Sequence, residues 1–127
     1  MDRILELQEA SRIAIAVKAD SYGRRRSVRI ASPPLTIVFE DGQECRTIDW
    51  STYGILVAGF RGNIINGEQI TVTVRSADVE GGGTVSGRVV WCSSDSDKIG
   101  IEFPRPSLSI QVIKIRMMRL GLIEPKV

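Results

Sequence analysis

From about residue 32 to residue 103 the sequence consists of short apolar stretches that are broken by turn residues. This pattern is typical of many short strands and differs from the regular alternation of strands and helices in α/β proteins. Asp41-Gly42 and Asn66-Gly67 are dipeptides that favour tight turns, and Gly81-Gly82-Gly83 interrupts the pattern once more. The sequence therefore predicts an all-β core.

Six segments of this region have the composition or the alternation of strands. In one of them Ile70, Val72 and Val74 alternate with polar residues, which predicts one buried face. Six short strands in an open sheet would leave exposed edges, so we expect a six-stranded antiparallel β-barrel that is closed or nearly closed. The expected strands are 35–40, 43–49, 54–60, 69–75, 84–92 and 98–103.

A C-terminal α-helix is expected over residues 107–120, beyond Pro104 and Pro106, with an end near Gly121. Its apolar residues occupy two faces, so a second covering surface is expected, and either a partner chain in a homodimer or the N-terminal segment would supply it. Residues 1–22 fit a helical turn and an alternating strand equally well. We divide the chain into an N-terminal switch segment (1–22), a barrel with its helix (23–121) and a tail (122–127).

Composition excludes several classes of function. The chain has 127 residues, a net charge of +2 and no histidine, and neither Cys45 nor Cys92 has a neighbouring base or a metal-binding spacing. No phosphate-binding loop with lysine is present, so we expect no enzyme, no metal and no cofactor. The apolar runs are too short for a membrane-spanning helix and the N-terminus lacks a secretory signal, which predicts a cytoplasmic protein.

Four arginines lie within six positions: Arg24, Arg25, Arg26 and Arg29. Such a run at the edge of a domain is often only a solvated linker. The alternative is a binding role, because a guanidinium donates paired hydrogen bonds to phosphate or to the O6 and N7 edge of guanine, and it stacks on purines. A guanine nucleotide would use all of these properties.

A second candidate feature is Asp49-Trp50-Ser51-Thr52-Tyr53-Gly54, which we place at a turn between two strands. Aspartate, serine and glycine are common in turns that only connect strands. The same residues also complement a guanine nucleotide, since a carboxylate accepts from the guanine N1 and N2 donors and glycine permits close approach of the backbone. Trp50 and Tyr53 are bulky, and we expect them to narrow the site or to stack on a ligand.

Together, Arg25-x-x-x-Arg29 and Asp49-x-Ser51-x-x-Gly54 resemble the two motifs of the PilZ family of cyclic di-GMP receptors. The resemblance covers about residues 22–120 and includes the later segments Gly87–Trp91 and Ile99–Phe103. It implies a six-stranded barrel with a trailing helix, over which the arginine segment folds to hold the dinucleotide.

The resemblance also implies roles for single residues. Arg25 and Arg29 would bind guanine and phosphate, Asp49 and Ser51 would hold the guanine edge, and Gly54 would shape the turn. Arg24 lies where an arginine is associated in the family with binding a stacked pair of ligands. Trp91 resembles an aromatic position that packs near the ligand in relatives, although core packing explains a tryptophan at the end of a strand equally well.

Two other functions are compatible with such a barrel. A nucleic-acid binding barrel is disfavoured because the basic residues outside Arg24–Arg29 are dispersed. A scaffold that contacts proteins without binding the nucleotide is the alternative that we retain. As a receptor, the chain is expected to act as a free-standing adaptor, in which ligand orders the arginine segment and repositions residues 1–20 for a downstream protein partner.

Overall fold

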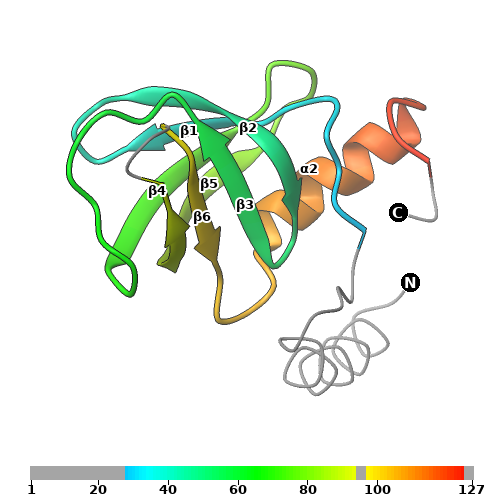
Figure 1. The fold of residues 1–127 in the computed structure, drawn as a ribbon. Helices are drawn as coiled ribbons and strands as arrows, with labels where there is room; N and C mark the ends of the chain where they lie inside the picture. The colour runs from blue at the N-terminus through cyan, green and yellow to red at the C-terminus, as the bar shows by residue number, and fades with distance from the viewer. Residues whose placement is uncertain (1–27, 94–96, 125–127) are drawn as a thin grey trace.

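The structure, a computed structural model, describes residues 28–93 and 97–124, and these residues form one barrel with one helix (Figure 1). The strands are all antiparallel to their neighbours and close in the order β1-β2-β3-β6-β5-β4. This confirms the predicted six-stranded barrel and its C-terminal helix. The strands are β1 (Thr36–Phe39), β2 (Glu44–Ser51), β3 (Gly54–Ala58), β4 (Gln69–Arg75), β5 (Gly82–Cys92) and β6 (Ile99–Glu102).

Of the expected strand bounds only those of 69–75 match the structure, and two of the differences affect a motif or an expected break in the chain. β2 continues through Asp49 to Ser51, so the motif expected to form one turn is divided between two strands and a two-residue connection. β5 begins at Gly82, within the triple glycine that was expected to interrupt the chain. In both cases the neighbouring strand extends the hydrogen-bonded ladder, since Ser51 pairs with Gly54 and Gly82 pairs with Arg75.

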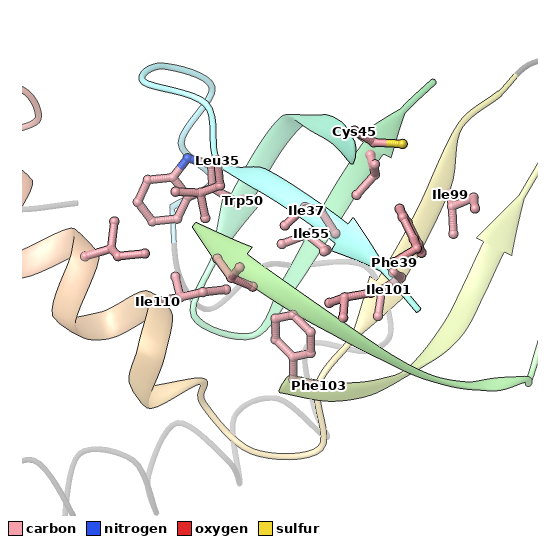
Figure 2. Close-up of a cluster of buried hydrophobic side chains, with 14 of the residues drawn as sticks. Leu35, Ile37, Phe39, Cys45, Trp50, Ile55, Ile99, Ile101, Phe103 and Ile110 are labelled. Atoms are coloured by element: carbon pink, nitrogen blue, oxygen red, sulfur yellow. The ribbon is translucent and has the colours of Figure 1, made fainter. Parts of the chain in front are cut away.

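The barrel interior is filled by alternating apolar side chains of every strand. Figure 2 shows this cluster, in which Trp50 is fully buried beside Leu35. The indole Nε1 of Trp50 donates a 2.8 Å hydrogen bond to the Pro33 carbonyl oxygen, which satisfies its polar atom inside the core. Trp50 was expected to line or narrow the ligand site, and that expectation is wrong because its place in β2 directs it inward.

The helix α2 (Leu108–Arg119) closes the core from outside the barrel, and Figure 2 shows Ile110 pointing from the helix toward it. Ile110, Ile113 and Met117 are fully buried, whereas Leu108 and Val112 remain exposed, as expected for a helix with apolar residues on two faces. Ser107 is the N-cap of the helix, and its Oγ accepts from the Ile110 amide at 3.2 Å.

The helix ends as predicted at Gly121, which has a φ of +73°. The amide of Gly121 donates to the Met118 carbonyl and the amide of Leu122 donates to the Met117 carbonyl, at 3.0 and 2.9 Å. This pattern of two bonds is the Schellman motif, which favours glycine at the left-handed position. Within the described ranges, no helix is both long enough and apolar enough to cross a membrane.

Candidate functional site

The candidate site lies on the outer surface of the hairpin formed by β2 and β3. Asp49 pairs with Leu56 and Ser51 pairs with Gly54, with Thr52 and Tyr53 as the connecting turn. Side chains alternate along a strand, so Asp49 and Ser51 point away from the core on either side of the buried Trp50. A β-bulge between Thr47 and Asp49 changes the alternation and turns Asp49 outward.

Arg29 lies over this surface and joins its two polar side chains. Its Nε donates to one carboxylate oxygen of Asp49 at 2.8 Å, and its Nη2 forms an ion pair with the same oxygen at 2.6 Å. Its Nη1 lies 3.5 Å from the Oγ of Ser51, which is at the outer limit of a hydrogen bond. Arg29 and Asp49 are 20 residues apart in the sequence and are in direct contact in the structure.

The backbone beside Arg29 explains how it reaches this position. Ile30 forms an isolated antiparallel bridge with Trp50, through hydrogen bonds of 2.7 and 2.9 Å in the two directions. Ile30 is also buried in the core. The bridge to Trp50 and the burial of its side chain both fix the position of Ile30. Its neighbour Arg29 is therefore placed beside Asp49 and Ser51, which flank Trp50 in the sequence.

Gly54 lies directly under the guanidinium of Arg29. A Cβ at this position would lie 2.8 Å from the carbonyl oxygen of Ile101 and 3.5 Å from Nη1 of Arg29. The first distance is shorter than real Cβ contacts allow, so any side chain here would separate β3 from β6. The glycine of the motif is therefore required by close packing of two strands and not by a left-handed turn conformation.

Ser51 is largely engaged by its own turn. It is buried, and its Oγ accepts a 3.1 Å hydrogen bond from the amide of Tyr53 in addition to the long contact with Arg29. A serine hydroxyl that accepts from the amide two residues on stabilises a turn. Ser51 thus both shapes the turn and faces the guanidinium, which combines the two roles that the sequence left as alternatives.

The Arg29–Asp49 pair is partly exposed, with side-chain exposures of 22% and 29%. The carboxylate neutralises the guanidinium and fixes its plane, while the Nη1 edge faces Ser51 at a distance that leaves it capacity for a better acceptor. The arrangement can therefore present an oriented, partly desolvated guanidinium to a phosphate or to a purine edge.

Trp91 belongs to the same outer surface but not to this cluster of contacts. Leu56, the partner of Asp49, pairs with Gly100, and Gly100 pairs with Trp91. The side chain of Trp91 is 45% exposed, which excludes the expectation that it packs in the core. A β-bulge between Val89 and Trp91 turns it outward.

Two of the predicted ligand-binding residues, Arg24 and Arg25, lie outside the described residues. The other five are described, and the structure brings Arg29, Asp49, Ser51 and Gly54 together. No group of histidine, cysteine or acidic residues suited to a metal ion occurs among residues 28–93 and 97–124.

The turn of the site is bonded to the segment that leads into α2. The carbonyl oxygen of Tyr53 accepts from the amide of Phe103 at 2.9 Å, and that of Thr52 accepts from the amide of Ser107 at 2.7 Å. Ser107 is the N-cap of α2. Sequence reasoning missed this connection, because it consists of backbone groups from distant parts of the chain and carries no side-chain signal.

Comparison with known proteins agrees with this architecture. The structure is similar to that of the Bacillus subtilis inhibitor of motility (MotI/DgrA), with a TM-score of 0.53 and 20% sequence identity. The alignment covers 80% of this chain and 53% of the inhibitor, so this chain spans about half the length of that protein. A search of curated proteins finds no match. The sequence model of the PilZ domain matches residues 23–117, and the chain therefore belongs to the PilZ domain family.

Proposed function

We propose that the protein is a receptor for cyclic di-GMP, which it binds on the outer surface of the β2–β3 hairpin. The observation that carries the proposal is the guanidinium of Arg29, held by Asp49 at 2.8 and 2.6 Å and facing Ser51 above Gly54. All four residues belong to the motifs that resemble those of the family, and the family match spans both motifs.

The ligand's chemistry matches these groups. A guanine base offers two acceptors, O6 and N7, to an arginine and two donors, N1 and N2, to a carboxylate. The free oxygen of Asp49 is suited to the donors, and the Nη1 edge of Arg29 is suited to an acceptor of the base or of a phosphate. Arg25, and Arg24 before it, supply further guanidinium groups for the second phosphate or for a second, stacked ligand.

The response to the ligand is proposed to run through the N-terminal segment. Arg24–Arg29 carries four like charges that ligand phosphates would neutralise, which favours one arrangement of the segment over the barrel. Residues 1–22 would then change their position relative to residues 23–121 and alter a surface that a downstream protein contacts. The chain acts in this proposal as a cytoplasmic adaptor and not as an enzyme.

Isothermal titration calorimetry with cyclic di-GMP tests the proposal. Wild type is expected to bind, and Arg25→Ala and Arg29→Ala are expected to weaken binding, with GMP and cyclic di-AMP as ligand controls. Each arginine makes charge-assisted bonds, so a loss of about tenfold or more per variant is expected. If folded wild type produces no binding signal, the receptor is rejected in favour of a scaffold that contacts proteins through exposed residues such as Leu108 and Val112.

A further inference from the structure

Helix α2 carries apolar side chains on the side that faces away from the barrel. At about 3.6 residues per turn, Leu108, Val112 and Ile115 share one side of the helix. The residues that fill the core lie on the opposite side and are Ile110, Ile113 and Met117. Leu108 and Val112 are 57% and 42% exposed, although a helix on the surface of a domain normally has polar residues on its outer side. We call Leu108, Val112 and Ile115 the outer stripe of α2.

The outer stripe is accompanied by positive charge. Arg116 and Arg119 are exposed in the last turn of α2. Arg116 donates to the backbone carbonyl oxygen of Glu80, a bond that leaves its charge in place. Residues 105–123 contain four basic residues and no acidic residue. The chemical complement of this surface is therefore a segment that combines apolar and acidic side chains.

A second copy of the chain does not have this complement. Two α2 helices packed along their outer stripes would bring only basic residues of 105–123 together, and like charges on neighbouring helices repel. Three aliphatic side chains are also a small surface, because each partner contributes about 800 Å² to a stable interface between separate proteins. Both arguments favour an occupant from the same chain.

The first residues of the chain have the required pattern. Residues 2–9 contain three acidic residues and one basic residue. The acidic residues are Asp2, Glu6 and Glu9. The apolar residues between them are Ile4, Leu5 and Leu7. This segment can cover an apolar surface and place carboxylates beside arginines at the same time.

The chain is long enough to bring this segment to α2. Arg29 lies 3.5 Å from Ser51, and the next residue, Thr52, accepts from the Ser107 amide at 2.7 Å. The described part of the chain therefore begins close to the N-terminus of α2. Residues 10–27 can extend over up to about 59 Å, at about 3.3 Å per residue, whereas the twelve residues of α2 are about 18 Å long.

We propose that residues 2–9 dock on the outer stripe of α2 in the same chain and run antiparallel to the helix. Because the connection to the barrel lies near the N-terminus of α2, a chain that runs back along the helix brings its first residues to the C-terminal end. Arg116 and Arg119 lie at that end. The apolar side chains of the segment then cover the outer stripe, and its carboxylates face the two arginines.

The connection within one chain makes a small contact sufficient. A segment joined to its site by a short linker has an effective concentration in the millimolar range, so a Kd of about 1 mM leaves it docked about half of the time. The docked segment withholds Leu108 and Val112 from other proteins. The inference goes beyond the proposed function and does not depend on cyclic di-GMP, so each of the two can fail without the other.

Methyl NOE measurements on the 127-residue chain without nucleotide test the docking. NOEs are expected between Leu7 and Val112. A mixture of isotope-labelled and unlabelled protein separates contacts within one chain from contacts between two chains. NOEs that occur only between chains would assign the outer stripe to a second copy and overturn the proposal. An absence of NOEs between residues 2–9 and the outer stripe would overturn it as well.

Substitutions on each side of the contact test which side chains make it. Leu7→Ser and Val112→Ser are each expected to abolish the NOEs that remain possible between residues 2–9 and the outer stripe. Ile65→Ser is the matched control, since Ile65 is another aliphatic residue, 70% exposed, in the connection between β3 and β4. It should leave the NOEs unchanged. Equal losses in the three variants would reject the contact.

Charge reversal tests the electrostatic part of the contact. Arg119→Glu is expected to lower the ratio of docked to undocked chains about twofold or more, as for an exposed ion pair, and the added substitution Glu9→Arg should restore it. Arg46→Glu makes the same change in net charge on β2, whereas α2 packs on β5, and should change the ratio less than about 1.5-fold. Equal effects of Arg119→Glu and Arg46→Glu would contradict the proposed direction of the segment. Circular dichroism of each variant verifies that the barrel is folded.

Discussion

The amide of Ser107 donates a 2.7 Å hydrogen bond to the carbonyl oxygen of Thr52, and this bond joins the start of helix α2 to the turn of the candidate site. Phe103 makes the same kind of bond to Tyr53 at 2.9 Å. Two short backbone bonds therefore connect the turn to the segment that leads into the helix. Leu108 and Val112 lie on that helix and are exposed apolar residues that a partner could contact.

Ligand binding is expected to slow hydrogen exchange of the amides of Phe103 and Ser107, because a ligand held by Arg29 restrains the turn whose carbonyls they bind. The amide of Gly42, which donates to Phe39 at 2.9 Å in the β1–β2 hairpin, serves as an internal control and should not change. Exchange is measured by NMR with and without saturating cyclic di-GMP. Equal slowing at all three amides would indicate global stabilisation and contradict a local connection.

Replacing Asp49 with alanine is expected to affect binding much more than stability. The Arg29–Asp49 pair is partly exposed, so its loss should change the free energy of unfolding by about 1 kcal/mol or less. The guanidinium would lose its fixed orientation, and affinity for cyclic di-GMP should fall by about tenfold or more. Glu44→Ala is the control, since it removes an exposed ion pair with Arg75 on another part of the barrel. Equal effects of the two variants on affinity would exclude an orienting role.

The two tryptophans are expected to differ in their contribution to stability. Trp50→Phe removes a buried indole and leaves the Pro33 carbonyl oxygen without its donor, so it should lower the free energy of unfolding by about 1–3 kcal/mol. Trp91→Phe changes a side chain that is 45% exposed and should cost about 0.5 kcal/mol or less. Urea denaturation compares them. Similar losses would be inconsistent with an inward Trp50 and an outward Trp91.

Much of the fold follows from the sequence. The Asp41-Gly42 turn, the alternation in Gln69–Arg75 and the glycine at position 121 are local signals, and the structure confirms the hairpin, the strand and the helix end that they predict. Non-local pairing was not predictable in the same way. β2 extends to Ser51 because Ile30 and Gly54 pair with its last residues, and Ile30 lies outside any strand pattern.

The candidate site was predictable only in part, because its motifs are local signals whereas the directions of its side chains depend on non-local strand pairing. The motifs identify Arg29, Asp49, Ser51 and Gly54, and the structure brings these four into contact. The inward direction of Trp50 and the outward direction of Trp91 depend on strand boundaries and on a bulge, which a single sequence does not reveal.

Gly82→Ala is expected to destabilise the barrel far more than Gly42→Ala. Both glycines have positive φ, of +130° and +92°. A Cβ at Gly42 has nothing within 4 Å, so only backbone strain of about 1–2 kcal/mol applies. A Cβ at Gly82 would overlap the Val74 carbonyl oxygen in β4, which adds a steric cost and should bring the loss above about 3 kcal/mol. Thermal unfolding tests this order, and equal melting temperatures would contradict it.

Stability at alkaline pH is expected to depend on Cys45. Burial is the main cause that raises the pKa of its thiol above the ordinary value of 9.0, with Asp41 and Asp97 acting in the same direction. The folded state therefore keeps the proton at a pH at which the unfolded chain has released it. The contribution of this group is fully present below about pH 9 and is lost as pH rises through the higher pKa of the folded state.

The comparison of wild type with Cys45→Ala isolates this contribution. The variant lacks the thiol, so its free energy of unfolding should fall less steeply than that of wild type as pH rises above 9.0, the ordinary value of the thiol. Burial lowers the pKa of Lys114, so this residue makes the free energy of unfolding rise with pH, because its buried ammonium group loses its charge. Lys114 is present in both proteins, and its contribution cancels in their difference. Urea denaturation over a series of pH values measures both slopes. Parallel curves would mean that the thiol ionises equally in the folded and unfolded states.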